Sequence, residues 1–169
     1  MGLDLSLADV AAAVYQYDRC RDSGKPCHHD PNCAERYQAV SVIDPWEFRY
    51  RQFVDIREGM LLTGMGYEAD IAPWEPYVGT GRGVSDEAAA LAWDVAWRSQ
   101  TTPGRLGIPL FKLGSNDRWI VTAREIDEAL VAYAKAPASH RAELESRPKW
   151  VAWLEWLALS REHGGFEVE

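Results

Sequence analysis

The side chains best suited to metal chemistry lie together in one short segment. Residues 20–33 read CRDSGKPCHHDPNC and hold all three cysteines of the 169-residue chain, together with two of its four histidines. Cysteine thiolate and histidine imidazole are the ligands that zinc takes in four-coordinate sites. Residues two apart reach a common metal with less strain than adjacent residues, so His29 is preferred and His28 is the alternative. The predicted zinc ligands are Cys20, Cys27, His29 and Cys33.

Two other interpretations of this segment stay open. The spacing C-x6-C-H-H-x3-C is not the paired C-x2-C arrangement of common zinc folds. A solvated polar loop with incidental cysteines is one alternative, and a catalytic thiol is the other. If all four positions are filled, the metal is structural, because catalysis needs an open position. Such a metal would contribute on the order of 10 kcal/mol to folding.

Other reactive side chains do not form a recognisable catalytic motif. Ser115, Asn116 and Asp117 lie in a turn sequence, His163 precedes two glycines, and acidic residues lie near His140. No nucleophile elbow, phosphate-binding loop or H-E-x-x-H sequence accompanies them. A small enzyme of unknown chemistry is therefore the weakest hypothesis, since catalysis needs several groups that converge on one point.

Charge and aromatic content favour a protein partner. The chain carries 26 acidic against 18 basic residues, a formal net charge of −8, and it has eight tryptophans. This excess of acid disfavours non-specific binding to nucleic acid or to anionic membranes. Large aromatic side chains dominate interface energetics. We predict a non-enzymatic, protein-binding protein with the partner-binding residues Trp74, Tyr77, Trp93 and Trp97.

The sequence carries no targeting or membrane signal that we can identify. The first residues, MGLDLSLADV, lack a basic start and include Asp4 and Asp9, so they do not resemble a signal peptide. The apolar runs are only a few residues long, whereas a membrane-spanning helix needs roughly 20. We therefore expect a cytoplasmic protein.

The residue pattern predicts a single, mostly helical α+β domain over residues 1–169, with the metal-clipped loop at 20–33. Helices are expected at about 7–18 after a Ser6 cap, from 45 to about 61 after an Asp44–Glu47 capping box, and at about 86–98. A Thr122–Glu125 capping box begins another helix, and two more follow at about 140–146 and from Pro148. One β-hairpin is expected at about 107–122, and residues 64–84 form a long Gly/Pro-rich loop.

Part of this pattern resembles a known DNA-binding family. The strings SDEAAALAW and LGIPLFKLGSNDRWIVTAREIDEAL, within residues 85–133, resemble the small winged-helix module of phage excisionases and MerR-like regulators. That resemblance implies a hairpin that carries Lys112 and Arg118 near phosphates. It also implies that Arg98 and Arg105 lie on or beside the recognition segment. A winged-helix DNA-binding regulator is therefore the alternative function.

A second resemblance covers more of the chain. Residues 107–130 and 150–166 resemble uncharacterised proteins of actinobacteria and their phages, through a GIP…K…SND…W.VT…E…AL string and a W..W..L…HGGF ending. This suggests a phage or accessory protein, such as an inhibitor or adaptor that acts on a host protein. A homo-oligomer formed through the Trp-rich last helix is compatible with each of these functions.

Overall fold

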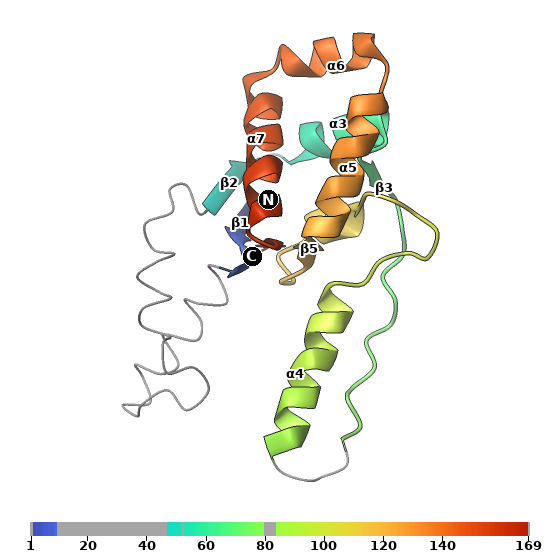
Figure 1. Cartoon of the computed structure of the whole chain (residues 1–169), viewed down its shortest axis with the longest axis vertical. Helices are drawn as coiled ribbons and strands as arrows, with labels where there is room; N and C mark the ends of the chain where they lie inside the picture. Colours follow the sequence, from blue (N-terminus) through green and yellow to red (C-terminus); the bar gives the residue numbers. More distant parts are fainter. Residues whose placement is uncertain (1, 10–46, 52, 80–83, 169) are drawn as a thin grey trace.

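The computed structural model describes residues 2–9, 47–51, 53–79 and 84–168 (Figure 1). Within them the chain has a mixed α+β fold, as the sequence predicts. The predicted zinc ligands at 20–33 lie outside the described residues. The helices are α3 (Val54–Thr63), α4 (Val84–Arg98), α5 (Ala123–Lys135), α6 (Ala138–Glu145) and α7 (Pro148–Glu162), with a 3₁₀ helix η1 at Leu110–Leu113.

A four-stranded antiparallel sheet joins segments that are far apart in the sequence. Its strands are β1 (Gly2–Leu7), β2 (Glu47–Arg51), β5 (Ile120–Thr122) and β6 (Gly165–Val168), in the order β2-β1-β6-β5. Leu5 pairs with Val168, and Leu7 pairs with Phe166, which in turn faces Val121 on β5. All five of these side chains are fully buried. The interior strand β6 therefore links β1 to the C-terminal half of the chain.

One predicted helix cap and one predicted helix start are wrong. Ser6 does not cap a helix, because it lies inside β1 opposite Glu47. Residues 8 and 9, directly after β1, are helical, and the rest of the helix predicted at about 7–18 lies outside the described residues. Glu47 does not close a capping box, because it is the first residue of β2, and the helix begins only at Val54. In both places apolar and polar residues alternate with a period of two, as in LDLSL and EFRYR, and pairing between these two strands prevails over the local cap signal.

The predicted hairpin at 107–122 is also wrong. Both strands exist, but they belong to different sheets: β4 (Ile108–Pro109) pairs in parallel with β3 (Gly66–Tyr67), and β5 pairs with β6. The residues after Pro109 enter η1 instead of extending the strand. The predicted long loop at 64–84 is correspondingly shorter, because its first residues form β3.

The remaining helix predictions are confirmed by well-defined ends. Gly64 terminates α3 with a φ of 74°, a left-handed conformation that favours glycine. The side chain of Thr122 accepts a hydrogen bond from the backbone N–H of Glu125, and the side chain of Glu125 accepts one from the backbone N–H of Thr122, which completes the capping box of α5. Pro148 occupies the first turn of α7.

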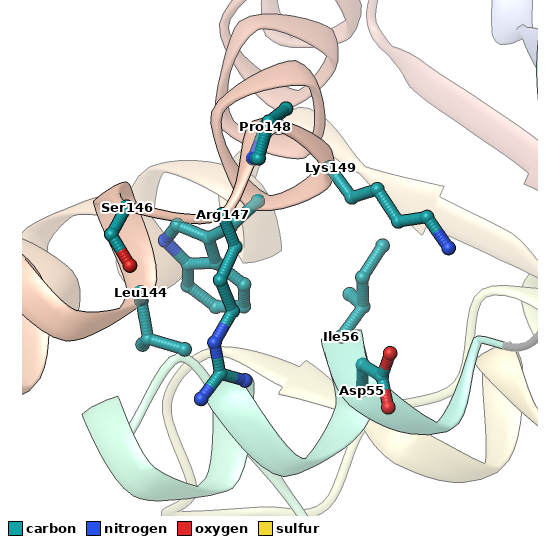
Figure 2. Close-up of a pocket in the computed structure, with 8 residues that line it drawn as sticks. Asp55, Ile56, Leu144, Ser146, Arg147, Pro148 and Lys149 are labelled. Carbon is teal, nitrogen blue, oxygen red and sulfur yellow. The ribbon is translucent and has the colours of Figure 1, made fainter.

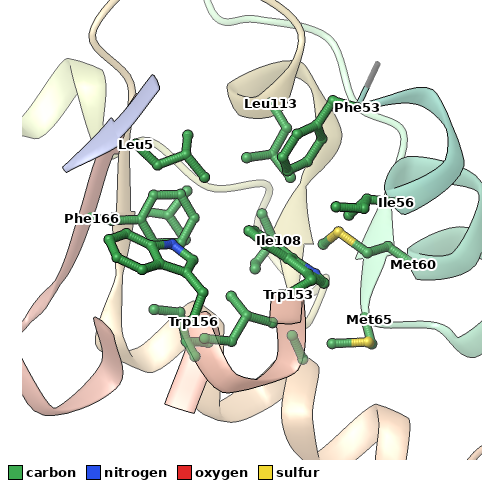
Figure 3. Close-up of a cluster of buried hydrophobic side chains, with 14 of the residues drawn as sticks. Leu5, Phe53, Ile56, Met60, Met65, Ile108, Leu113, Trp153, Trp156 and Phe166 are labelled. Atoms are coloured by element: carbon green, nitrogen blue, oxygen red, sulfur yellow. The ribbon is translucent and has the colours of Figure 1, made fainter. Parts of the chain in front are cut away.

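The core lies between the sheet and helices α3, α5 and α7, and aromatic rings fill much of it (Figure 3). The rings of Phe53 and Trp153 meet edge to face, with centroids 5.2 Å apart. Trp150, Trp153 and Trp156 of α7 are at most 3% exposed. The tryptophans of the last helix are therefore core residues and do not offer a surface to a second copy of the chain.

Helix α4 differs from the other helices in its position. Figure 1 shows α4 extending away from the sheet and from the α5–α7 layer, with the chain that follows β3 running beside it. Among the described residues, no helix combines the length and the apolar character needed to cross a membrane.

Candidate protein-binding arm

The most prominent surface feature is an arm built from two segments. One is α4, and the other is residues 68–79, which have no regular secondary structure and are here called the extended segment. Pro73 and Pro76 fix φ near −65° and disfavour helix in the residues before them. The sequence therefore keeps the extended segment open along the length of α4, as Figure 1 shows.

Side chains of one helix face attach the extended segment to α4. The indole N–H of Trp93 donates to the carbonyl of Glu75 at 2.8 Å, and the indole N–H of Trp97 donates to the carbonyl of Ala72 at 3.2 Å. The backbone N–H of Ala72 donates to the side-chain oxygen of Gln100 at 2.7 Å. Trp93 and Trp97 lie about one helical turn apart on one face of α4, and Gln100 follows just after the end of the helix. The arm therefore holds itself together through polar contacts.

The opposite face of α4 is apolar and uncovered. Leu91 is 59% exposed and Val95 is 39% exposed. Three alanines on the same side of the helix are exposed as well. We call this stripe the outer face; its residues are Ala88, Leu91, Ala92, Val95 and Ala96. An apolar helix face without a charged residue is unusual in contact with water and is typical of a surface that meets another protein.

The extended segment adds further exposed apolar side chains. Trp74 is 56% exposed, Ile71 is 46% exposed and Val78 is 90% exposed, while Tyr77 is half-buried. Of the four predicted partner-binding residues, Trp74 is thus accessible. Trp93 is partly exposed but is engaged with the extended segment.

The arm is strongly acidic. The extended segment and α4 together contain six carboxylates and one base, Arg98. The carboxylates are Glu68, Asp70, Glu75, Asp86, Glu87 and Asp94. Two of them are in ion pairs: Asp94 pairs with Arg98 at 2.8 Å, and Glu68 pairs with Arg57 of α3 at 3.5 Å.

A compact joint connects the arm to the body. The ring of Trp97 packs against that of buried Trp119 with centroids 4.7 Å apart. Arg98 forms ion pairs with Asp94 at 2.8 Å and with Glu167 of β6 at 3.2 Å, and it donates to the carbonyl of Arg118 at 3.1 Å. We assign Trp97 to this joint rather than to a partner contact.

The residues implied by the winged-helix resemblance do not form one basic surface. Lys112 is 0% exposed, so its expected place on a hairpin near phosphates is wrong. Arg98 is occupied in the joint, and Arg118 pairs with Glu167 at 2.6 Å. Arg105 stacks over the ring of Tyr67, 4.9 Å from its centroid. These four residues form no continuous positive patch. A DNA-binding function stays a prediction.

Lys112 instead forms a buried ion pair that sequence analysis did not identify. Its ammonium donates to Glu125 Oε1 and to the carbonyl of Ile120, each at 2.7 Å. Burial lowers the pKa of Lys112, and the neighbouring Glu125 carboxylate opposes that shift. Because Glu125 also caps α5, this pair connects η1, β5 and α5. It is closed to solvent, so we assign it a structural role.

One open pocket of about 550 Å³ lies where the start of α3 meets the α6–α7 turn (Figure 2). Its floor is formed by the buried side chains of Ile56, Leu144 and Trp150. Asp55, Arg147 and Lys149 stand around it, so its rim carries charges of both signs. The size suits a small molecule, but none of the predicted site residues lines it.

Three of the other reactive groups, Ser115, Asp117 and His163, have structural partners. Ser115 donates to Asp117 at 2.5 Å within the turn, and His163 Nδ1 lies 2.9 Å from the carboxylate of Asp9. In the described part of the chain, no three residues among His, Cys, Asp and Glu are placed to hold a metal ion. The zinc site at 20–33, which lies outside that part, stays a prediction.

No protein-family model, no curated protein and no solved structure matches this chain. The spacing of Leu91 and Val95, four residues apart, is the sequence signal for the outer face, but sequence alone does not tell which apolar face of α4 packs inward.

Proposed function

We propose that this protein acts by binding another protein through the outer face of its arm. One observation carries the proposal: α4 satisfies its Trp93 face with its own extended segment, and the opposite apolar face has no cover within the described residues. Burying exposed apolar surface against a partner is the main favourable term in protein association. An inhibitor or adaptor that acts on a host protein is compatible with this activity, and we propose the cytoplasm as its place of action.

A double substitution on α4 tests this proposal. Leu91→Gln with Val95→Gln makes the outer face polar, and glutamine is a good helix former, so α4 is kept. Because both side chains are exposed, we expect the melting temperature to stay within about 4 °C of wild type, since each exposed substitution usually changes stability by no more than about 0.5 kcal/mol. Partner recovery in affinity purification from the native host should fall at least about tenfold, which corresponds to 1.4 kcal/mol.

Matched controls make the result specific. Val131→Gln on α5 removes an apolar side chain that is 52% exposed and lies outside the arm, so it should retain the partner. Trp74→Ala should weaken partner recovery without loss of stability. If the Leu91/Val95 variant recovers the same partners as wild type, in the same amounts, the outer face is not the binding surface.

A further inference from the structure

The extended segment has the sequence and the course of a polyproline II helix. Its central residues, Pro73, Trp74, Glu75 and Pro76, form a P-x-x-P sequence. Each proline fixes φ near the polyproline II value and keeps the residue before it out of the α-helical region. Residues 68–79 accordingly contain no helix, strand or turn, and Figure 1 shows them running as an extended chain beside α4.

The hydrogen bonds between this segment and α4 follow the repeat of a polyproline II helix. Such a helix has about three residues per turn, so residues three positions apart lie on one edge of it. Ala72 and Glu75, whose carbonyls accept from the indoles of Trp97 and Trp93, are three positions apart. Each of them directly precedes a proline. Tryptophan side chains of α4 therefore hold one edge of the segment in a defined register.

The two prolines occupy a second edge, and that edge is accessible. Pro73 and Pro76 are also three positions apart, and both are exposed. Trp74 lies between them and is 56% exposed. The attachment to α4 thus uses backbone carbonyls of the segment and leaves both proline rings, one turn apart, open to a partner.

We propose that the extended segment is a preformed polyproline II ligand for an aromatic-lined groove of a partner protein, the type of groove that SH3 and WW domains carry. P-x-x-P segments dock in such grooves, because proline rings one turn apart pack between aromatic side chains. The contacts with Trp93 and Trp97 support this choice, since indole groups already bind one edge of the same segment. Little conformational entropy is lost on binding, because the prolines and the α4 contacts already restrict the chain.

This surface differs from the one in the proposed function. The extended segment lies on the Trp93 side of α4, whereas Leu91 and Val95 of the outer face lie on the opposite side. The inference therefore goes beyond the function proposed above and does not depend on it.

A purified SH3 domain and a purified WW domain test the inference. Each is titrated into the full-length chain, and binding is measured by isothermal titration calorimetry. We expect at least one of the two domains to bind. Replacement of a tryptophan in the groove of that domain should weaken its binding to the unaltered chain at least about tenfold, a measurement that does not depend on the folding of any variant of this protein.

Proline variants of the chain locate the contact. Pro73→Ala with Pro76→Ala should weaken binding of the domain at least about tenfold, because both rings are lost and the segment becomes more flexible. Pro103→Ala removes an exposed proline outside the arm, so it is the matched control and should bind as the wild type does. Circular dichroism and thermal unfolding of both variants check that the fold is kept.

Two results overturn the inference. One is the failure of both domains to bind the wild-type chain, and the other is binding that the Pro73/Pro76 variant retains in full. Leu91→Gln with Val95→Gln should leave domain binding unchanged. A loss in this variant as large as in the Pro73/Pro76 variant would place the contact on the outer face and would also contradict the inference.

The inference and the proposed function fail in different ways. If affinity purification recovers a partner that depends on Leu91 and Val95, but neither domain binds, the proposed function stands and the polyproline ligand does not. If a domain binds through Pro73 and Pro76, but the Leu91/Val95 variant recovers all partners of the wild type, the inference stands and the outer face is not a binding surface.

Discussion

At the scale of single residues, the Lys112–Glu125 pair is the best-defined polar element inside the molecule. Both residues are 0% exposed, and the carboxylate of Glu125 also accepts from the backbone N–H and the hydroxyl of Thr122. A buried charge without its partner is strongly unfavourable, whereas an intact pair contributes little net stability. The removal of either residue therefore leaves the other buried without its partner, and this cost is what makes the pair important for stability.

Substitution of Lys112 should be among the most damaging single changes in the chain. Lys112→Met leaves the Glu125 carboxylate buried without its cation, and we expect a loss of about 3–5 kcal/mol in the free energy of unfolding. Urea denaturation measures it. Adding Glu125→Gln to this variant should recover part of the loss, because no unpaired charge remains. Lys135→Met, at an exposed position of α5, is the control, and an equal effect of the two lysine substitutions would contradict the structural role.

The cysteine segment gives a second prediction at this scale. Protein purified without chelator should contain one zinc per chain by elemental analysis, and Cys33→Ser should lower that content, because thiolate is a ligand that serine does not replace. The apparent stability should fall when a chelator removes the metal. Full metal content in Cys33→Ser would exclude Cys33 as a ligand, and metal-free wild type would leave the polar-loop interpretation.

At the scale of elements, two adjacent glycines, Gly164 and Gly165, lie where α7 leads into β6, and only Gly165 also lies close against β5. Gly165 has a φ of 117°, and a Cβ there would lie 2.0 Å from the carbonyl oxygen of Val121 on β5. Gly164 has a φ of 80°, but a Cβ there meets nothing within 4 Å. Both positions disfavour other residues through backbone conformation, and only Gly165 does so through close approach as well.

The two glycines therefore give a matched pair of variants. Gly164→Ala should lower the free energy of unfolding by about 1–2 kcal/mol, the usual cost of a left-handed conformation. Gly165→Ala should cost at least about 2 kcal/mol more, because β5 must also move away from β6. Thermal unfolding of both variants measures the difference. Equal losses would mean that the backbone contact at Val121 relaxes freely.

Capping patterns in the sequence predicted the start of one helix correctly and gave wrong helix starts elsewhere. Thr122 and Glu125 cap α5 as expected, because both partners of a capping box lie within four residues. The similar pattern at Asp44–Glu47 failed, because Glu47 begins a strand that pairs with β1. The alternation of LDLSL at 3–7 is typical of a strand, but the cap preference of Ser6 placed the helix start inside that strand, whereas the first helical residues are 8 and 9. Short strands that depend on distant partners, such as β6, give little signal of their own.

At the scale of the whole molecule, the tryptophans divide between the core and the arm. The core takes up four tryptophans, Trp119 and the three of α7, which sequence alone could not distinguish from interface residues. The arm holds Trp74 and Trp93 outside that core. The four residues predicted to bind a partner all lie in the arm, and partner binding stays a prediction. The sequence could not tell that Trp97 belongs to the joint or that Leu91 and Val95 face outward.

The order of strands in the sheet has a consequence for how the chain reaches this fold. β1 and β2 can pair early, but the other neighbour of β1 is β6, which lies at the opposite end of the sequence. Contacts between residues so far apart in the sequence form late. Until they form, β1 offers an open row of backbone donors and acceptors to other chains. Aggregation during refolding should therefore arise from this intermediate, and dilution should suppress it.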